Sequence, residues 1–278
     1  MEGSPQTCVE RAVQKQYWIE HSANATVETM MLDSKAADID KMERPEVLEL
    51  LGSVEGKDVV ELGAGIGRFT APLASTAKSV VALDFMENLI EENRRTNSHY
   101  GNIDFRCGDA TELELPASSQ DLVFSNWLLM YLNDDEVRRL AQRMLGWLRP
   151  GGCIFFRESC FRQSGDRARG SNPSHYRSPR EYFAAFDFVR EDSDKGGAGA
   201  HQLELAFCKS IDTYVRVKQN QNQICWKWVK VPVPASQPAV DRRFLDDGQY
   251  SSRGIARYEW IFGEGFMSPG GSATSERL

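Results

Sequence analysis

The chain has 278 residues, with 33 lysine and arginine against 40 aspartate and glutamate residues, and a formal net charge of -7. This length suffices for one large α/β domain, and the acidic balance excludes the basic surface typical of nucleic-acid-binding domains. Six scattered cysteines without a C-x-x-C pair, and apolar runs too short to span a bilayer, predict a cytoplasmic protein with neither nucleic acid nor membrane as a partner.

The first forty residues precede the regularly patterned part of the chain. We expect residues 1–15 to be flexible and residues 16–40 to form an N-terminal segment. Apolar residues then predict a helix over residues 44–51, which ends at Gly52. The α/β core follows this glycine and runs to about residue 160.

A glycine-rich turn follows the first predicted strand, residues 58–60, and precedes an apolar-periodic helix over residues 69–77. Its glycines are Gly63, Gly65 and Gly67. Glycine lets the backbone of such a turn pass directly against a bound ligand, because a Cβ would collide with it. The turn therefore predicts a ligand site.

The residues around this turn indicate which ligand it holds. A dinucleotide-binding fingerprint has its third glycine at the position of Arg68. Glu61 ends the strand, and its carboxylate is a poor neighbour for a pyrophosphate but suits a ligand with a sulfonium and an amino group. The turn thus favours S-adenosylmethionine as the cofactor.

Further strands with polar ends follow the turn. They cover residues 79–84, 102–106, 121–125 and 153–156. Asp84 can accept from both ribose hydroxyls of an adenosine, and Asp109 can accept from an adenine amino group. Either acid alone could be an ordinary polar strand end, but their order on alternating strands and helices favours the cofactor site. An amphipathic helix over residues 137–148 separates the last two strands.

A local basic cluster follows these strands in a chain of net negative charge. Six arginines lie between residues 157 and 180. Guanidinium groups suit phosphate, because two parallel N–H bonds can meet two oxygens, so the phosphate-binding candidates are Arg167, Arg169, His175 and Tyr176. A solvated arginine-rich loop is the competing interpretation.

Four aromatic residues are candidates for holding an alkylammonium group by cation–π attraction, worth about 0.5–2 kcal/mol each. They are Tyr17, Trp18, Trp127 and Tyr131. Core packing is the competing interpretation for Trp18 and Trp127. Together, an anion site and an aromatic cage predict a small phosphorylated amine as the substrate.

The last part of the chain completes the sheet and then changes character. We expect a loop or hairpin tip over residues 191–200 and strands near residues 203–216 and 223–231. Three prolines mark residues 232–241 as a linker, after which residues 242–271 are patterned again.

Five blocks of the sequence resemble the N-terminal methyltransferase domain of plant-type phosphoethanolamine N-methyltransferases. The blocks are residues 16–22, 30–36, 124–132, 156–161 and 172–177. The resemblance implies a class I S-adenosylmethionine-dependent methyltransferase fold, which is a Rossmann-like α/β domain with a mostly parallel seven-stranded sheet. This domain would cover residues 16–231, with a lid over residues 16–40. The implied reaction is N-methylation of phosphoethanolamine toward phosphocholine, with the first methylation favoured.

The resemblance and the motifs together assign residues to each ligand. The cofactor-binding residues are Gln16, Ser34, Glu61, Gly63, Gly65, Asp84, Phe85, Asp109, Ala110, Ser125 and Asn126. For the substrate phosphate, the resemblance also implies Tyr176 and adds, on the last strand, Lys230 or possibly Lys227. No metal site is expected.

The resemblance also implies how the amine loses its proton. Methyl transfer needs an uncharged amine, whereas a primary ammonium has a pKa of about 10. Tyr17 matches the tyrosine of a Tyr-His pair in single-domain relatives and is the candidate to orient the amine and pass on its proton, directly or through a water relay. The histidine position is Tyr131, so Tyr131 or Glu158 is the expected partner.

The C-terminal segment repeats part of the lid pattern. Residues 249–250 and Ser268 are spaced almost like residues 16–17 and Ser34. We therefore expect residues 242–278 to be a partial lid of a second methyltransferase domain, in either a truncated two-domain enzyme or a short form. Two alternative functions stay open: a methyltransferase for another small amine or hydroxyl substrate, and a donor-binding domain that is inactive without its second half.

Overall fold

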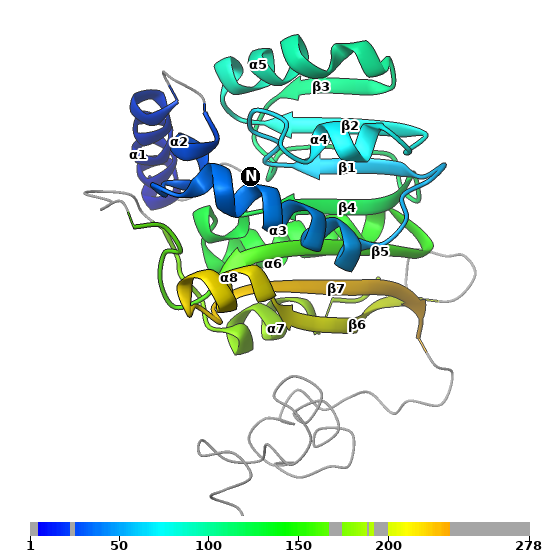
Figure 1. Ribbon diagram of the computed structural model, residues 1–278. Coiled ribbons are helices and arrows are strands. Elements are labelled where there is room, and N and C mark those ends of the chain that lie inside the picture. The colour runs from blue at the N-terminus through cyan, green and yellow to red at the C-terminus, as the bar shows by residue number, and fades with distance from the viewer. Residues whose placement is uncertain (1–4, 23–25, 167–173, 188, 192–199, 234–278) are drawn as a thin grey trace, which may run out of the picture.

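A computed structural model of the chain describes residues 5–22, 26–166, 174–187, 189–191 and 200–233. Seven strands form one sheet in the order β3-β2-β1-β4-β5-β7-β6 (Figure 1). The strands are β1 Asp58–Leu62, β2 Ser79–Asp84, β3 Ile103–Cys107, β4 Gln120–Asn126, β5 Leu148–Ser159, β6 His201–Ser210 and β7 Gln223–Pro232. Strands β1 to β5 pair in parallel, whereas β7 is antiparallel to both β5 and β6.

Helices cover both faces of this sheet (Figure 1). The α-helices are α1 Pro5–His21, α2 Val27–Met31, α3 Ala36–Leu51, α4 Thr70–Ala74, α5 Glu87–Asn97, α6 Asp134–Trp147, α7 Pro179–Asp187 and α8 Asp212–Lys218, with 3-10 turns η1 Ser98–Tyr100 and η2 Leu129–Tyr131. Neighbouring strand residues point to opposite faces, so Val59 packs with α3, α4 and α8, while Val60 packs with α6. Burial on both faces explains why the central strands β1, β2 and β4 carry apolar runs, whereas the edge strand β3 is partly exposed and alternates apolar with charged residues.

Helix α6 shows how directly the sequence specifies one of these layers. Its buried residues Val137, Leu140, Ala141, Met144 and Leu145 recur with helical spacing. Asn133 and Glu136 form a capping box at its start, in which each side chain accepts from the other residue's backbone N–H, at 3.0 and 2.8 Å. The predicted helix is therefore confirmed, although its start lies at Asp134.

The C-terminal half of the sheet differs from the prediction in one element. A strand was expected over residues 203–216, but β6 ends at Ser210 and residues 212–218 form helix α8. Glu46 of α3 accepts from the backbone N–H groups of Asp212 (2.6 Å) and Thr213 (3.0 Å). A carboxylate from another helix thus caps the start of α8, and the local sequence of residues 211–218 does not predict this contact.

The N-terminal segment is also more regular than expected. Residues 5–21 form helix α1, so the part of the predicted flexible segment after Pro5 is helical. Helices α1 and α2 lie beside the carboxyl ends of β1 and β2 (Figure 1). The partial lid expected over residues 242–278, most of the linker, Arg167 and Arg169 lie outside the described residues. Among the described helices, none has both the length and the apolar character that a membrane span requires.

Candidate functional site

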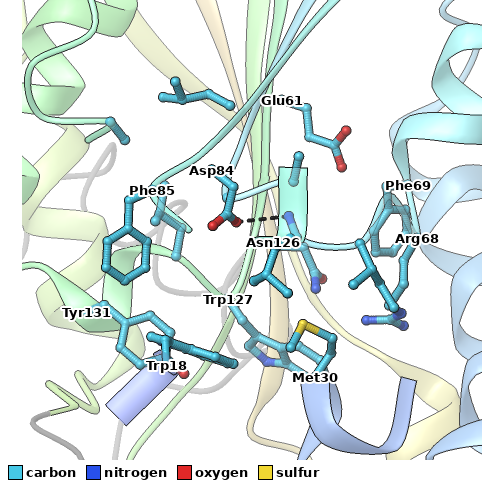
Figure 2. Close-up of a pocket in the computed structure, with 18 of the residues that line it drawn as sticks. Trp18, Met30, Glu61, Arg68, Phe69, Asp84, Phe85, Asn126, Trp127 and Tyr131 are labelled. Carbon is cyan, nitrogen blue, oxygen red and sulfur yellow. Dashed lines mark hydrogen bonds between the residues drawn. The ribbon is translucent and has the colours of Figure 1, made fainter. Parts of the chain in front are cut away.

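A pocket of about 1140 Å³, measured to its open mouth, lies where α1 and α2 face the carboxyl ends of the parallel strands. Nine of the predicted cofactor-binding and catalytic residues line it: Glu61, Gly63, Gly65, Asp84, Phe85, Asp109, Ala110, Asn126 and Tyr131. Trp18 of α1 and Met30 of α2 close the side opposite the strands (Figure 2). The strand ends and the N-terminal segment therefore share one cavity.

The glycine-rich turn forms the wall of this pocket between β1 and α4. Gly65 has φ +54, a backbone conformation that favours glycine, and a Cβ there would lie 3.7 Å from Met30 Sδ. Gly67 has a different role from the one that the motif predicts. With φ +90, it lies so close to α5 that a Cβ would be 2.7 Å from Asn93 Cγ. Gly67 is thus required by buried side chains and not by a ligand.

Asp84 ends β2 inside the pocket, as predicted. Its Oδ2 accepts from Gly65 N at 2.9 Å (Figure 2), and its Oδ1 accepts from Met86 N at 3.0 Å. Burial raises the pKa of Asp84 to about 6, although the hydrogen bonds from these backbone N–H groups stabilise the carboxylate and lower the pKa. At neutral pH Asp84 is therefore mainly an anion, held by the glycine turn and able to accept from ligand hydroxyls.

Glu61 lies deeper and behaves differently. Thr70 Oγ1 donates to its Oε2 at 2.5 Å. Burial raises the pKa of Glu61 to about 8, and the nearby charge of Asp84 adds to this increase. Glu61 is therefore mostly protonated at neutral pH, and a cation bound in the pocket would favour its ionised form.

Asp109 follows β3 and lines the pocket, next to Ala110. Its Oδ1 accepts from Thr111 N at 2.8 Å and Thr111 Oγ1 at 2.7 Å. Phe85 lines the pocket as well. The two strand-end acids, Asp84 and Asp109, thus open into one pocket, as their order in the sequence predicts.

The segment after β4 forms the floor of the pocket and is held by buried charges. Glu158 Oε1 accepts from the backbone N–H groups of Leu128 (2.9 Å) and Leu129 (2.7 Å). Arg177 donates to the carbonyl oxygens of Leu129 (2.9 Å) and Leu132 (2.6 Å). Burial raises the pKa of Glu158 to about 7. Glu158 does not line the pocket, and its observed contacts hold the backbone of the segment that does.

The predicted aromatic cage is only partly formed. Trp18 and Tyr131 line the pocket with edge-to-face rings 5.8 Å apart, and Phe85 lies beside them (Figure 2). Tyr17 is buried behind Trp18, with ring centroids 5.6 Å apart, and does not line the pocket. Trp127 does line it, but the Arg157 guanidinium lies 3.6 Å from its ring centroid. A protein cation thus already occupies the aromatic surface that was expected to hold the substrate.

Helix α1 turns a different set of side chains toward the pocket from the one expected. Gln16 is exposed, its Nε2 donates to Glu20 Oε1 at 2.8 Å, and it does not line the pocket. Gln14 lines the pocket instead, and its Nε2 donates to the Tyr131 carbonyl oxygen at 2.5 Å. Helical spacing from Trp18 was a signal that could have identified Gln14.

Two further cofactor predictions lie outside the pocket lining. Ser34 is exposed, and its backbone N–H and Oγ donate to the Asp166 carboxylate at 2.9 and 2.5 Å. Ser125 is buried in β4, and its Oγ has no hydrogen-bond partner among the residues that the structure describes. In this arrangement Ser34 fixes the turn before α3, and Ser125 lies under the pocket floor.

The structure places Lys230, a predicted phosphate ligand, away from the pocket. Because β7 runs antiparallel to β5, Lys230 lies at the amino end of the parallel strands, opposite the pocket. Its buried Nζ donates to the carbonyl oxygens of Leu145 (3.1 Å) and Leu148 (2.9 Å) and pairs with Glu191. Lys227, the other candidate, donates to the Leu51 carbonyl oxygen at 2.9 Å. Both lysines therefore donate hydrogen bonds to backbone carbonyl oxygens at the C-terminal ends of neighbouring helices, α6 and α3.

The arginine-rich segment does not form one anion site within the described residues. Arg157 and Arg177 are buried in protein contacts, while Arg162 and Arg180 are exposed. Neither His175 nor Tyr176 lines the pocket. His175 N nevertheless donates to the carbonyl oxygen of the pocket residue Met130 at 2.7 Å, which brings residues 174–176 to the pocket rim.

The sequence is similar to that of known methyltransferases. Residues 59–152 match a family model described as a methyltransferase domain. The chain is 56% identical, over 97% of its length, to phosphoethanolamine N-methyltransferase 1 of Arabidopsis thaliana, and covers 54% of that protein. It is 54% identical, over 97% of its length, to a phosphoethanolamine N-methyltransferase of Triticum aestivum, and covers 53% of it. The chain thus spans about half the length of the curated relatives that it matches.

A solved structure supports the same relationship. The structure of Haemonchus contortus phosphoethanolamine N-methyltransferase 1, in complex with phosphoethanolamine and S-adenosylhomocysteine, matches with TM-score 0.78 and 38% identity, over 83% of this chain and 51% of that one. An S-adenosylmethionine-dependent methyltransferase of Leishmania major shares the fold at 20% identity and TM-score 0.60, over 80% of this chain and 82% of that one. The predicted class I methyltransferase fold is confirmed, and the chain is homologous to the plant phosphoethanolamine N-methyltransferases.

Proposed function

We propose that this homologue of the plant phosphoethanolamine N-methyltransferases transfers a methyl group from S-adenosylmethionine to the amine of phosphoethanolamine. One observation carries the proposal: the glycine turn and Asp84 share a single pocket with Trp18 of α1 and with Tyr131. Donor-binding and acceptor-facing residues must lie this close together, because the methyl group passes directly from sulfur to nitrogen.

The pocket suits the donor. Asp84 is held by two backbone N–H groups, and Gly65 leaves open the space that a side chain would fill. Asp84 would accept from the ribose hydroxyls, Asp109 and Ala110 would hold the adenine, and Asn126 and Gly63 would lie along the methionine part. When bound, S-adenosylmethionine supplies a methyl group on a positively charged sulfur.

The acceptor must reach this methyl group as a free amine. Tyr131 lines the pocket, and we assign it to orient the amine and to relay the ammonium proton, either as its phenolate or through a water molecule, while Trp18 contributes an aromatic face for the cation. Tyr17 lies behind Trp18 and reaches the amine only if α1 shifts. Closure of α1 and α2 over the pocket would exclude water and favour loss of the proton.

Residues at the pocket rim would hold the phosphate. The hydrogen bond from His175 N to Met130 O keeps residues 174–176 beside the pocket. Arg167 and Arg169 follow Ser164, which lines the pocket, by three and five positions along the chain. This segment supplies positive charge in an acidic chain, which suits a phosphomonoester.

A methyl-transfer assay tests the proposal. The chain is incubated with methyl-labelled S-adenosylmethionine and, in parallel, with phosphoethanolamine, its mono- and dimethylated forms, and ethanolamine. We expect label in the product of phosphoethanolamine and little in that of ethanolamine, and the methylated substrates report how many steps follow the first. Equal labelling of ethanolamine would refute recognition of the phosphate.

A second candidate function follows from the length of the chain. Because the chain spans about half of its curated relatives, it could bind the donor yet depend on a second methyltransferase domain for turnover. Calorimetric binding of S-adenosylhomocysteine without turnover of any phosphobase would favour this alternative. A cytoplasmic location belongs to the same proposal and is tested by cell fractionation.

A further inference from the structure

A buried ion network lies beside the floor of the pocket and centres on Glu43 of α3. Glu43 is fully buried, and both of its oxygens bind arginines. Arg68 Nη2 donates to Oε1 at 2.6 Å, and Arg157 Nη2 donates to Oε2 at 2.5 Å. Arg68 also donates to Asp40 Oδ1 through Nε at 2.9 Å and Nη2 at 2.6 Å. A single carboxylate therefore bridges two guanidinium groups.

This bridge is electrostatically required. Arginine stays protonated in proteins, so Arg68 and Arg157 both bring a permanent charge into the interior. The side chain of Arg157 is fully buried and Glu43 is its ion-pair partner, whereas Arg68 also has Asp40. Removing the charge of Glu43 would leave the buried Arg157 cation without this partner and Arg68 with Asp40 alone, an arrangement that favours displacement of Arg157.

Both arginines act on residues of the pocket. The Arg157 guanidinium stacks on Trp127 at 3.6 Å from the ring centroid, and its Nη1 donates to Asn126 Oδ1 at 3.3 Å. Arg68 directly follows the glycine turn and lines the pocket itself. Glu43 does not line the pocket, but it controls three residues that do.

Trp127 is held in a conformation that it would not adopt by itself. Its φ is +58, a region that few bulky residues occupy. Its backbone N–H donates to the Arg157 carbonyl oxygen at 2.8 Å, and its Nε1 donates to Gln223 Oε1 at 3.0 Å. Arg157 thus holds this residue by its backbone and by its ring, and Glu43 in turn holds Arg157.

We propose that Glu43 is a positioning residue for methyl transfer: by bridging Arg68 and Arg157, it keeps Trp127, Asn126 and the glycine turn in the arrangement that aligns donor and acceptor. This inference rests on the proposed function. Because α3 directly follows α2, the bridge also anchors the base of the N-terminal segment to the pocket floor.

The test compares two substitutions on the same helix. Glu43→Gln keeps the size of the side chain but removes its charge, and we expect kcat to fall roughly 100-fold, as for a misalignment of about 1 Å, while KM for phosphoethanolamine changes little. Glu46→Gln is the matched control. Glu46 holds the start of α8 and does not line the pocket, so we expect kcat to stay at the wild-type value.

A third variant keeps the interior charge-balanced. Arg157→Lys retains the cation beside Glu43 but loses the planar stack on Trp127, so we expect the melting temperature to stay near wild type and kcat to fall at least tenfold. Wild-type kcat in Glu43→Gln or in Arg157→Lys would overturn the proposal. If Glu43→Gln does not fold, Arg157→Lys alone decides.

A measurement independent of turnover separates this inference from the proposed function. The 19F resonance of Trp127 in 5-fluorotryptophan-labelled protein, assigned with Trp127→Phe, should shift in Glu43→Gln and Arg157→Lys but not in Glu46→Gln. An unmoved resonance would overturn the positioning role. If the wild-type chain methylates no phosphobase but the resonance still shifts in Glu43→Gln and Arg157→Lys, only the proposed function is refuted.

Discussion

Replacing Gly67 with alanine should destabilise the chain through helix α5, although the sequence motif suggests a ligand-binding glycine. A Cβ there would lie 2.7 Å from Asn93 Cγ and closer still to Asn93 Oδ1 and Asn97 Nδ2. These amides are part of a buried chain in which Asn97 Nδ2 donates to Asn93 Oδ1 at 2.8 Å and Asn93 Nδ2 donates to Thr70 Oγ1 at 2.9 Å. They cannot retreat without breaking hydrogen bonds.

The magnitude has two parts. Alanine at φ +90 costs about 1–2 kcal/mol in backbone strain, and overpacking a filled site costs about 1–3 kcal/mol more. We therefore expect Gly67→Ala to lower the free energy of unfolding by about 2–5 kcal/mol. Gly101→Ala is the matched control, because Gly101 has φ +73 but nothing within 4 Å of its Cβ position, which leaves only the backbone cost.

Urea unfolding followed by circular dichroism measures both variants. Equal loss of stability in Gly67→Ala and Gly101→Ala would refute the packing argument. A double variant tests it from the other side: Asn97→Ala removes one of the clashing amides, so the cost of Gly67→Ala should be smaller in that background than in the wild-type chain.

Three further predictions concern the acids and lysine discussed above. Asp84→Ala should weaken S-adenosylhomocysteine binding about 10- to 150-fold, as expected for hydrogen bonds to a charged group worth about 1.5–3 kcal/mol, and normal affinity in calorimetry would contradict the ribose assignment. Because burial raises the pKa of Glu61 to about 8 from an ordinary 4.5, its contribution to stability is complete below pH 4.5 and is lost as pH rises toward 8. The unfolding free energy of the ligand-free chain should therefore fall more steeply between pH 5 and 8 than that of Glu61→Gln, and parallel pH profiles would exclude this ionisation. Lys230→Met should lower the unfolding free energy by about 1.5–3 kcal/mol and leave KM for phosphoethanolamine unchanged, whereas a large rise in KM would restore Lys230 to the substrate site.

Much of the fold follows from local patterns. Strand β2 begins and ends at the predicted residues, and β1, β3 and β4 differ from the predictions by one or two residues at either end. The central strands β1, β2 and β4 are buried on both faces and carry short apolar runs bounded by polar residues, which define them without further information, whereas the edge strand β3 alternates apolar with charged residues. The acids at their carboxyl ends then meet in one pocket, because parallel strands end at the same edge of the sheet.

Individual side chains were harder to place because their position depends on direction and phase. One position along a helix rotates a side chain by about 100 degrees, which is why Gln14 and not Gln16 faces the pocket. One reversed strand moves Lys230 from the substrate edge of the sheet to the opposite edge.

The sequence by itself determined the parallel strands of the sheet, the glycine turn, and the two acids of the pocket, Asp84 at the end of β2 and Asp109 after β3. Only the tertiary structure decided that Arg157 stacks on Trp127 and that Glu43 bridges two arginines, 25 and 114 positions away in the chain. The physical reason is the distance along the chain over which each kind of interaction acts. Backbone preference and apolar periodicity act over a few residues, whereas buried charges are satisfied by whichever partners folding brings within hydrogen-bond distance.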